Sequence, residues 1–251
     1  MTLSRIYKIV DMLLMHHSEK ELIDLLLKND ELMSEKEIVI FDIGCYKGEF
    51  SKRINKELKN RTEKKIIYHL FDPNIKCKNY LKDNLRFSYN YKPYAISDTN
   101  SEAIYYYNPI FESAGSSLNP LTSKDELWKI SRSFVLGKKK QPFQPLKVKT
   151  FSIDNYCEIN NINKIDIIKI DVEGSQLEVI KGMEKMLHFC SIIYIEIFAS
   201  KKTYKSRSSE LISYLSNNNF VMLKNRKILS SSIFSSLKVS DALFINKDLV
   251  V

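Results

Sequence analysis

The amino-acid sequence predicts an α/β fold: a doubly wound, mainly parallel sheet with helices on both faces, preceded by N-terminal helices. Short apolar runs alternate along the chain with segments whose apolar residues follow a helical period. The apolar runs are continuous, which is typical of parallel strands buried on both faces. The sequence shows no internal repeat and no segment with the composition of a linker, so these elements are expected to form one domain.

The first 36 residues predict one or two amphipathic helices. Apolar residues recur at helical spacing from Ile6 to Leu14 and again from Leu22 to Leu26. We expect these helices to pack on the main domain or on a second subunit. Residues 1–36 are therefore interpreted as a helical segment and residues 37–251 as the main domain.

From residue 37 onward, strands and helices are expected to alternate. EIVIFDIG predicts a strand that runs into glycine, and KKIIYHLFD predicts the next one. Pro73 stands near the first turn of the second expected helix, where a missing N–H costs least. Strands are expected over 37–44, 64–72, 91–98, 102–108, 164–173, 191–199, 220–224 and 241–246, helices over 47–60, 73–85, 175–187 and 208–217, and regular structure over 146–157.

Residues 108–145 break this alternation. Four of the six prolines lie between positions 109 and 145, and only one short helix is expected there, begun by Thr122 or Ser123. A connection of this length with so little regular structure is usually functional. We interpret it as an insertion that serves as a lid or contacts a substrate.

The composition narrows the class of protein. The formal charge of +9 invites a nucleic-acid interpretation, but the lysines are spread along the chain, and only GKKKQ (137–141) is a local basic cluster. The four cysteines include no CxxC pair and the four histidines are dispersed, which disfavours a zinc site or a disulfide scaffold. No stretch predicts a membrane span or a signal peptide, so a cytoplasmic protein is expected.

The ends of the first two strands carry carboxylates. Asp42 precedes a loop with Gly44 and Gly48, and Asp72 follows the second strand. Ligands of doubly wound sheets bind at the carboxyl ends of the strands, where an acid can accept hydrogen bonds from ribose hydroxyls. The glycine spacing is GxxxG and not the GxGxxG of dinucleotide sites, which favours S-adenosylmethionine over NAD. A structural role of Asp72 at a helix start is the alternative.

These motifs resemble the FkbM family of S-adenosylmethionine-dependent methyltransferases. FDIGCYKG, FDPN, AISD, GSSL, TFSIDNY, IIKIDVEGSQLEVIKGMEKML, YIEIF and ALFIN stand in the family's order, over roughly residues 38–246. The resemblance implies a class I methyltransferase fold, Rossmann-like, with a seven-stranded sheet and one antiparallel strand near the C-terminus. It also implies O-methyl transfer. The sequence departs from the family at Cys45 and Tyr46, where Ala and Asn are common, and at Asp72, where Glu is usual.

Together with the strand-end carboxylates, this resemblance implies which residues contact the cofactor. Asp98 and its neighbour in AISD are expected to border the adenine. The full set expected to bind S-adenosylmethionine is Asp42, Gly44, Tyr46, Gly48, Asp72, Pro73, Ser97, Asp98 and Asp171.

KIDVEG (169–174) places three charges at alternate positions of an otherwise apolar strand. Lys169, Asp171 and Glu173 share one face if the strand persists to its end. A structural account is available: Ser175 and Glu178 match a capping box, Glu173 suits a helix start, and Lys169 can pair with Asp171. A buried ion pair gives little net stability, however, which favours a functional role for Asp171.

Methyl transfer to a hydroxyl suggests roles for these charged residues. An attacking hydroxyl must lose its proton, either to a carboxylate or with the help of a divalent metal, and the sequence leaves both alternatives open. Asp171, Glu173 and Glu196 are the expected catalytic carboxylates, and Lys169 is expected to orient an acceptor oxygen or hold Asp171.

The expected acceptor is a sugar hydroxyl, nucleotide-activated or glycan-linked, of cell-surface polysaccharide biosynthesis. Ser116, Ser117, Trp128 and Lys169 are the expected substrate contacts. RNA or other nucleic-acid methylation and a polyketide-type hydroxyl are the alternatives; the first lacks its usual Pro-Pro-aromatic motif here. No nucleic-acid partner and no membrane insertion are expected, and the N-terminal helices offer a surface for a homo-oligomer.

Overall fold

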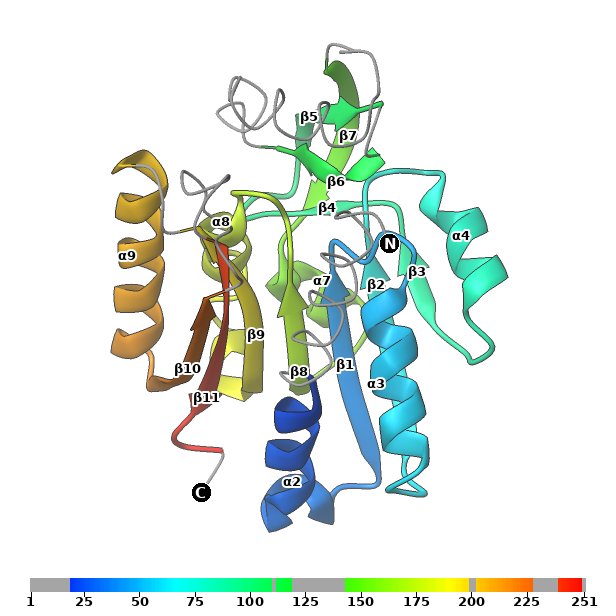
Figure 1. Cartoon of the computed structure of the whole chain (residues 1–251), viewed down its shortest axis with the longest axis vertical. Helices are drawn as coiled ribbons and strands as arrows, with labels where there is room; N and C mark the ends of the chain where they lie inside the picture. Colours follow the sequence, from blue (N-terminus) through cyan, green and yellow to red (C-terminus); the bar gives the residue numbers. More distant parts are fainter. Residues whose placement is uncertain (1–18, 110–111, 119–142, 199–201, 228–238, 250–251) are drawn as a thin grey trace, which may run out of the picture.

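The computed structural model describes residues 19–109, 112–118, 143–198, 202–227 and 239–249. Its main element is a seven-stranded sheet with the strand order β10-β11-β9-β8-β1-β2-β3 (Figure 1). All neighbouring strands are parallel except β11, which is antiparallel to both β9 and β10. This sheet confirms the predicted class I methyltransferase architecture. The strands are β1 (Glu37–Ile43), β2 (Lys65–Phe71), β3 (Asn90–Lys92), β8 (Ile165–Ile170), β9 (Cys190–Phe198), β10 (Phe220–Lys227) and β11 (Val239–Asn246).

The sheet is buried on both faces because its central strands are apolar on both sides. In β1, Phe41 and Ile43 belong to one apolar cluster, while Ile38 and Ile40 belong to another on the opposite face. All six residues of β8 are buried. These two clusters make up the core and fix the strands whose ends carry the charged residues.

Helices cover both clusters. Apolar residues of α3 (Glu49–Lys59) and α4 (Cys77–Asn84) pack on one face, and those of α7 (Ile153–Ile159), α8 (Gln176–Lys181) and α9 (Lys202–Asn217) on the other. Helical residues 19–28 and α2 (Asp30–Ser34) join α3. Glu19 is buried and forms a two-point ion pair with Arg53, at 2.6 Å for both bonds. The described part of the N-terminal segment therefore packs on the domain; residues 1–18 lie outside the described residues.

A second, four-stranded sheet lies beyond the carboxyl ends of the main strands (Figure 1). Its order is β4-β7-β5-β6, with β4 (Ala95–Ile96), β5 (Glu102–Asn108), β6 (Glu112–Ser117) and β7 (Gln144–Phe151). Part of the predicted insertion over 108–145 thus forms β6 and the start of β7. The short helix expected at Thr122 lies outside the described residues, and the role of the insertion stays a prediction.

Three local predictions around KIDVEG were wrong. The strand β8 ends at Ile170 rather than at residue 173, and Glu173 has a left-handed backbone with φ of 51°. Ser175 occupies the N-cap of α8 but makes no capping hydrogen bond with its side chain, and Glu178 pairs with Arg207, so the expected capping box does not form. The helix expected over 175–187 also ends early, at Lys181, and η1 (Met186–Phe189) follows after a turn.

Candidate active site

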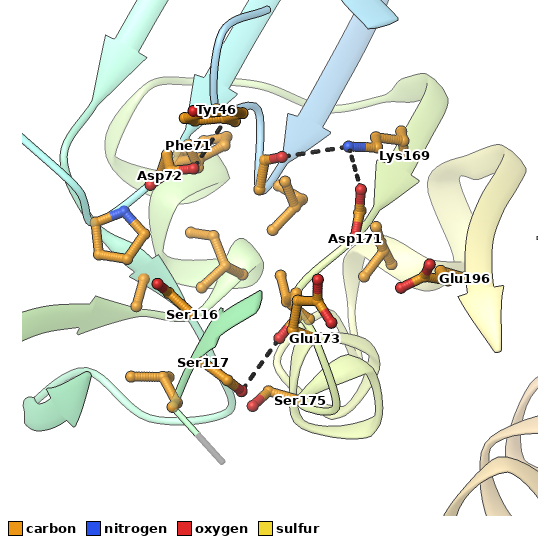
Figure 2. A pocket seen from close by; sticks show the side chains of 18 of the residues that line it. Tyr46, Phe71, Asp72, Ser116, Ser117, Lys169, Asp171, Glu173, Ser175 and Glu196 are labelled. Carbon is orange, nitrogen blue, oxygen red and sulfur yellow. Dashed lines mark hydrogen bonds and ion pairs between the residues drawn. The ribbon is translucent and has the colours of Figure 1, made fainter. Parts of the chain in front are cut away.

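A cavity of about 260 Å³ lies at the carboxyl edge of the main sheet. Residues that follow β1, β2 and β8 form one side of it, residues of β9 and β11 form another, and β6 borders it from the smaller sheet (Figure 2). This is the edge at which doubly wound sheets bind their ligands. Most of the predicted site residues meet here.

A row of polar residues crosses three neighbouring strands next to the cavity; Lys169 and Tyr194 line the cavity, and Asp42 lies behind Lys169. Asp42 of β1 is in register with Lys169 of β8, and Lys169 is in register with Tyr194 of β9. Asp42 is fully buried and accepts a hydrogen bond from Ser51 Oγ at 2.7 Å. Side chains at paired positions point to the same face. The charges of KIDVEG thus continue a polar row that begins in the first strand.

Lys169 connects this row to the cavity. Its ammonium lies 3.4 Å from Asp42 Oδ1 and 3.2 Å from Asp171 Oδ2, and it donates to the carbonyl of Gly44 at 3.2 Å (Figure 2). Burial lowers the pKa of Lys169, but the attraction of Asp171 and Asp42 outweighs burial, so the pKa lies well above the ordinary value for lysine. Lys169 is therefore a fixed cation.

The glycine loop is packed directly on the segment that follows β8. Gly44 has a φ of 77°, and a Cβ atom at this position would lie 1.9 Å from the carbonyl oxygen of Asp171. The amide of Asp171 in turn donates to the carbonyl of Ile43 at 3.0 Å. Only glycine fits at this position, so the loop and the charged segment come together in the cavity wall.

Asp72 holds the opposite side of the loop in place. Its Oδ2 accepts from the amide of Tyr46 at 3.1 Å and its Oδ1 from the amide of Asn74 at 2.9 Å. Asp72 lines the cavity although its exposed fraction is only 2%. Its carboxylate therefore lies where the ribose hydroxyls of an adenosine cofactor are expected.

A second group of polar residues in the main cavity consists of acids and lies nearer the opening of the cavity. Asp171 follows β8, and Glu196 of β9 is in register with Asp241 of β11. All three line the cavity together with Glu173. Tyr194 donates from its hydroxyl to Asp241 Oδ2 at 2.8 Å. Burial, and then the Asp241 carboxylate, raise the pKa of Tyr194 well above its ordinary value, so this hydroxyl remains a donor.

Two serines of β6 border the cavity from the smaller sheet. Ser116 accepts from the amide of Asn108 at 2.7 Å, and Ser117 donates to the carbonyl of Val172 at 3.4 Å (Figure 2). Both serines line the cavity. The expected substrate-contacting serines thus lie beside the segment that carries Asp171 and Glu173.

The structure brings most, though not all, of the expected site residues to the cavity. Gly44, Tyr46, Asp72, Pro73, Ser116, Ser117, Lys169, Asp171, Glu173 and Glu196 line it. Asp42, Gly48, Ser97 and Asp98 are absent from its lining. Asp42 lies behind Lys169, Gly48 packs against Leu81 and Leu85, and Asp98 is exposed. Trp128 lies outside the described residues.

Tyr194 and Asp241 are cavity residues that were not predicted from the sequence. A signal for Tyr194 was present, because it stands two positions before Glu196 in YIEIF and so shares its face. Asp241 begins DALFIN, and only an antiparallel strand brings its first residues to the carboxyl edge of its neighbours. Tyr94, which also lines the cavity, carries no comparable signal.

The residues present fit S-adenosylmethionine. Asp72 offers acceptors for ribose hydroxyls, Gly44 leaves the space that a side chain would fill, and the carboxylates match the positive charge of the sulfonium. Among the described residues, no group of three His, Cys, Asp or Glu side chains is arranged to hold a metal ion. The described helices also include none long and apolar enough to cross a membrane.

The fold and this cavity define a class I methyltransferase. The methyltransferase FkbM domain model matches residues 42–222, and the chain belongs to this family. The family's methyl donor is S-adenosylmethionine, which is therefore the cofactor of this chain.

Individual relatives match more weakly. The hexuronic acid methyltransferase AglP of Haloferax volcanii is 39% identical over 54 residues, which span 22% of this chain and 23% of AglP. A precorrin-6y C5,15-methyltransferase from Geobacter metallireducens matches with 10% identity and a TM-score of 0.41, over 90% of this chain and 87% of that one. The plantazolicin methyltransferase BpumL, solved with SAH, matches with 12% identity and a TM-score of 0.43, over 97% and 89%.

Proposed function

We propose that this chain is an O-methyltransferase that methylates a sugar hydroxyl with S-adenosylmethionine. The proposal rests on one observation, a group of carboxylates that lies beside the glycine loop in one cavity. These carboxylates belong to Asp171, Glu173, Glu196 and Asp241. When bound, the cofactor supplies a methyl group on a positively charged sulfonium. An alcohol attacks such a methyl only if its proton can leave, and nearby carboxylates can accept it.

Each part of the cavity has a role in this proposal. Asp72, Gly44, Tyr46 and Pro73 bind the cofactor. Lys169 holds Asp171 toward the cavity through the 3.2 Å ion pair and fixes the carbonyl of Gly44 at the same time. Oriented in this way, Asp171 accepts a hydrogen bond from the acceptor hydroxyl and keeps its oxygen about 3 Å from the methyl carbon.

A sugar is the acceptor class that we favour. The serines of β6 supply neutral hydroxyls next to the carboxylates, a combination suited to a ring with several hydroxyl groups. The AglP match adds support, since that protein is named a hexuronic acid methyltransferase. We place the activity in the synthesis of a cell-surface polysaccharide, with a nucleotide-activated or glycan-linked sugar as the acceptor.

The experiment that tests the function is a methylation screen. The full chain is incubated with isotopically labelled S-adenosylmethionine and panels of nucleotide sugars, lipid-linked glycans, RNA and polyketide-type alcohols, and products are read by mass. We expect one added methyl on a sugar hydroxyl. Transfer to RNA or to a polyketide-type alcohol without transfer to any sugar would contradict the sugar assignment.

A further inference from the structure

A second, smaller cavity lies directly behind the acidic wall of the first. Its volume is about 20 Å³, and Gln176, Glu196, Arg207 and Ser208 are among the residues that line it. Glu196 lines both cavities. On its outer side the small cavity reaches α9, where Arg207 and Ser208 are partly exposed. The lining also includes Leu177, Ile197 and Leu211. Glu196 therefore separates the main cavity from a small space of mixed polar and apolar lining that approaches the surface.

Gln176 indicates what occupies this space. Its exposed fraction is 6%, and its Nε2 has no hydrogen-bond partner among the described residues. Buried amide groups are nearly always hydrogen-bonded to protein or to ordered water, because an unsatisfied donor is costly. A volume of about 20 Å³ accommodates one water molecule. A water molecule in the small cavity would give this donor a partner.

Methyl transfer to a hydroxyl releases one proton in each turnover. The acceptor oxygen bonds to the methyl carbon, the bond between that carbon and sulfur breaks with its electron pair on sulfur, and the hydroxyl proton must go elsewhere. When acceptor and cofactor fill the main cavity, little room is left there for water to take the proton. A route through the wall would let the proton leave while both are still bound.

We propose that Asp171, which accepts the hydrogen bond of the hydroxyl, passes this proton to Glu196. Glu196 then passes it to a water molecule bound by Gln176 in the small cavity, from which it leaves past Arg207 and Ser208. The proposal rests on the O-methyl transfer proposed above. Asp171 and Glu173 also line the main cavity, but neither lines the small one, and Asp171 is held by Lys169. Of these three carboxylates, only Glu196 touches both spaces.

Two substitutions of Glu196 test its part in the route. Glu196→Gln keeps the size of the side chain without the charge, and kcat should fall about 100-fold or more, as when a general base is lost. Glu196→Ala leaves a hole between the two cavities, and added formate should restore part of its lost turnover, which a merely structural residue would not allow. Cofactor affinity, measured by calorimetry on the same proteins, should stay within about threefold of wild type, less than a tenfold or 1.4 kcal/mol change.

Gln176→Met tests the water. It keeps a similar length and removes the donor, so kcat should fall while the KM for the acceptor and the cofactor affinity stay near wild type. Gln144→Met, at an exposed position of β7, is the matched control and should keep full turnover. Crystal structures without acceptor should show a water within hydrogen-bond distance of Gln176 Nε2 in wild type and no such water in Gln176→Met.

The outcomes separate this inference from the proposed function. If wild type methylates a hydroxyl acceptor while Glu196→Gln or Gln176→Met is equally active, the proton route alone is overturned. A dry small cavity in the wild-type crystal structure also overturns it. If wild type methylates no hydroxyl acceptor at all, the proposed function fails and the inference fails with it.

Discussion

Lys169 and its two carboxylates illustrate how single residues set the chemistry of the cavity. The Lys169 side chain is 10% exposed, Asp42 is fully buried, and Asp171 is 40% exposed. Removing one member of a buried ion pair leaves an uncompensated charge, which typically costs about 3–5 kcal/mol. Asp42 therefore holds Lys169 inside the protein. The second ion pair, between Lys169 and the more exposed Asp171, lies where a ligand can reach it.

Replacing Asp171 with asparagine should separate catalysis from cofactor binding. Asp171→Asn keeps the shape of the side chain but loses its charge, and we expect turnover to fall by roughly 100-fold or more. Cofactor affinity, measured by calorimetry, should remain largely intact because Asp72 and the glycine loop are unchanged. Asp83→Asn, an exposed change in α4, is the control. Full activity of Asp171→Asn would contradict its catalytic role.

At the scale of elements, the direction of each strand decides which residues reach the cavity. The sequence predicted the ends of β1, β2 and β8 as site positions because parallel strands bring their carboxyl ends to one edge. Asp241 was not predicted because the resemblance implies one antiparallel strand near the C-terminus without showing which of the two closing strands it is. The left-handed backbone at Glu173 was not predicted because a positive φ at a glutamate has no local signal in KIDVEG.

The contact between Gly44 and Asp171 can be tested with a pair of glycine substitutions. Gly44 and Gly48 have similar φ values of 77° and 74°, so alanine should cost about 1–2 kcal/mol of strain at either. At Gly48 the added Cβ meets flexible leucine side chains, but at Gly44 it meets the Asp171 backbone. We expect Gly44→Ala to lose more unfolding free energy in urea titrations and to bind the cofactor more weakly. Equal losses would contradict this packing.

At the scale of the molecule, the basic composition gives no indication of the charge of the site. The chain has a formal charge of +9, yet the described residues that line the main cavity include five carboxylates and one lysine. Periodicity predicted the order of strands and helices, because burial on two faces leaves long apolar runs. The smaller sheet was not predicted as a separate layer, since its pairing joins β4, β5 and β6 to the distant β7. Such pairing has no local signal in the sequence.

The stability of the molecule should depend on pH through His69. Its ring is buried beside Tyr156, with Nδ1 2.8 Å from the hydroxyl, and burial together with Lys92 lowers the pKa of His69 to about 4. The unfolded chain, with a pKa near 6.5, binds a proton in the window between these values and the folded protein does not. Unfolding free energy should therefore be fully present above pH ~6.5 and fall by up to roughly 3 kcal/mol as pH drops to ~4.

Urea titrations at several pH values measure this dependence, and His69→Asn is the comparison because it cannot take up a proton near neutrality. The difference between the two proteins should shrink with acidification, even though other groups also titrate. A difference that is constant from pH 7 to pH 4 would contradict the assignment of this slope to His69.

The antiparallel direction of β11 also has a consequence for engineering. The family match covers residues 42–222 and ends before β11, and the cofactor-facing residues Gly44, Tyr46 and Asp72 all lie within it. Asp241 lies outside the matched residues, on a strand that supplies none of these cofactor-facing residues. A library of substitutions limited to the first residues of β11 would change the shape offered to an acceptor and leave the cofactor contacts intact, which makes this strand a starting point for new acceptor specificity.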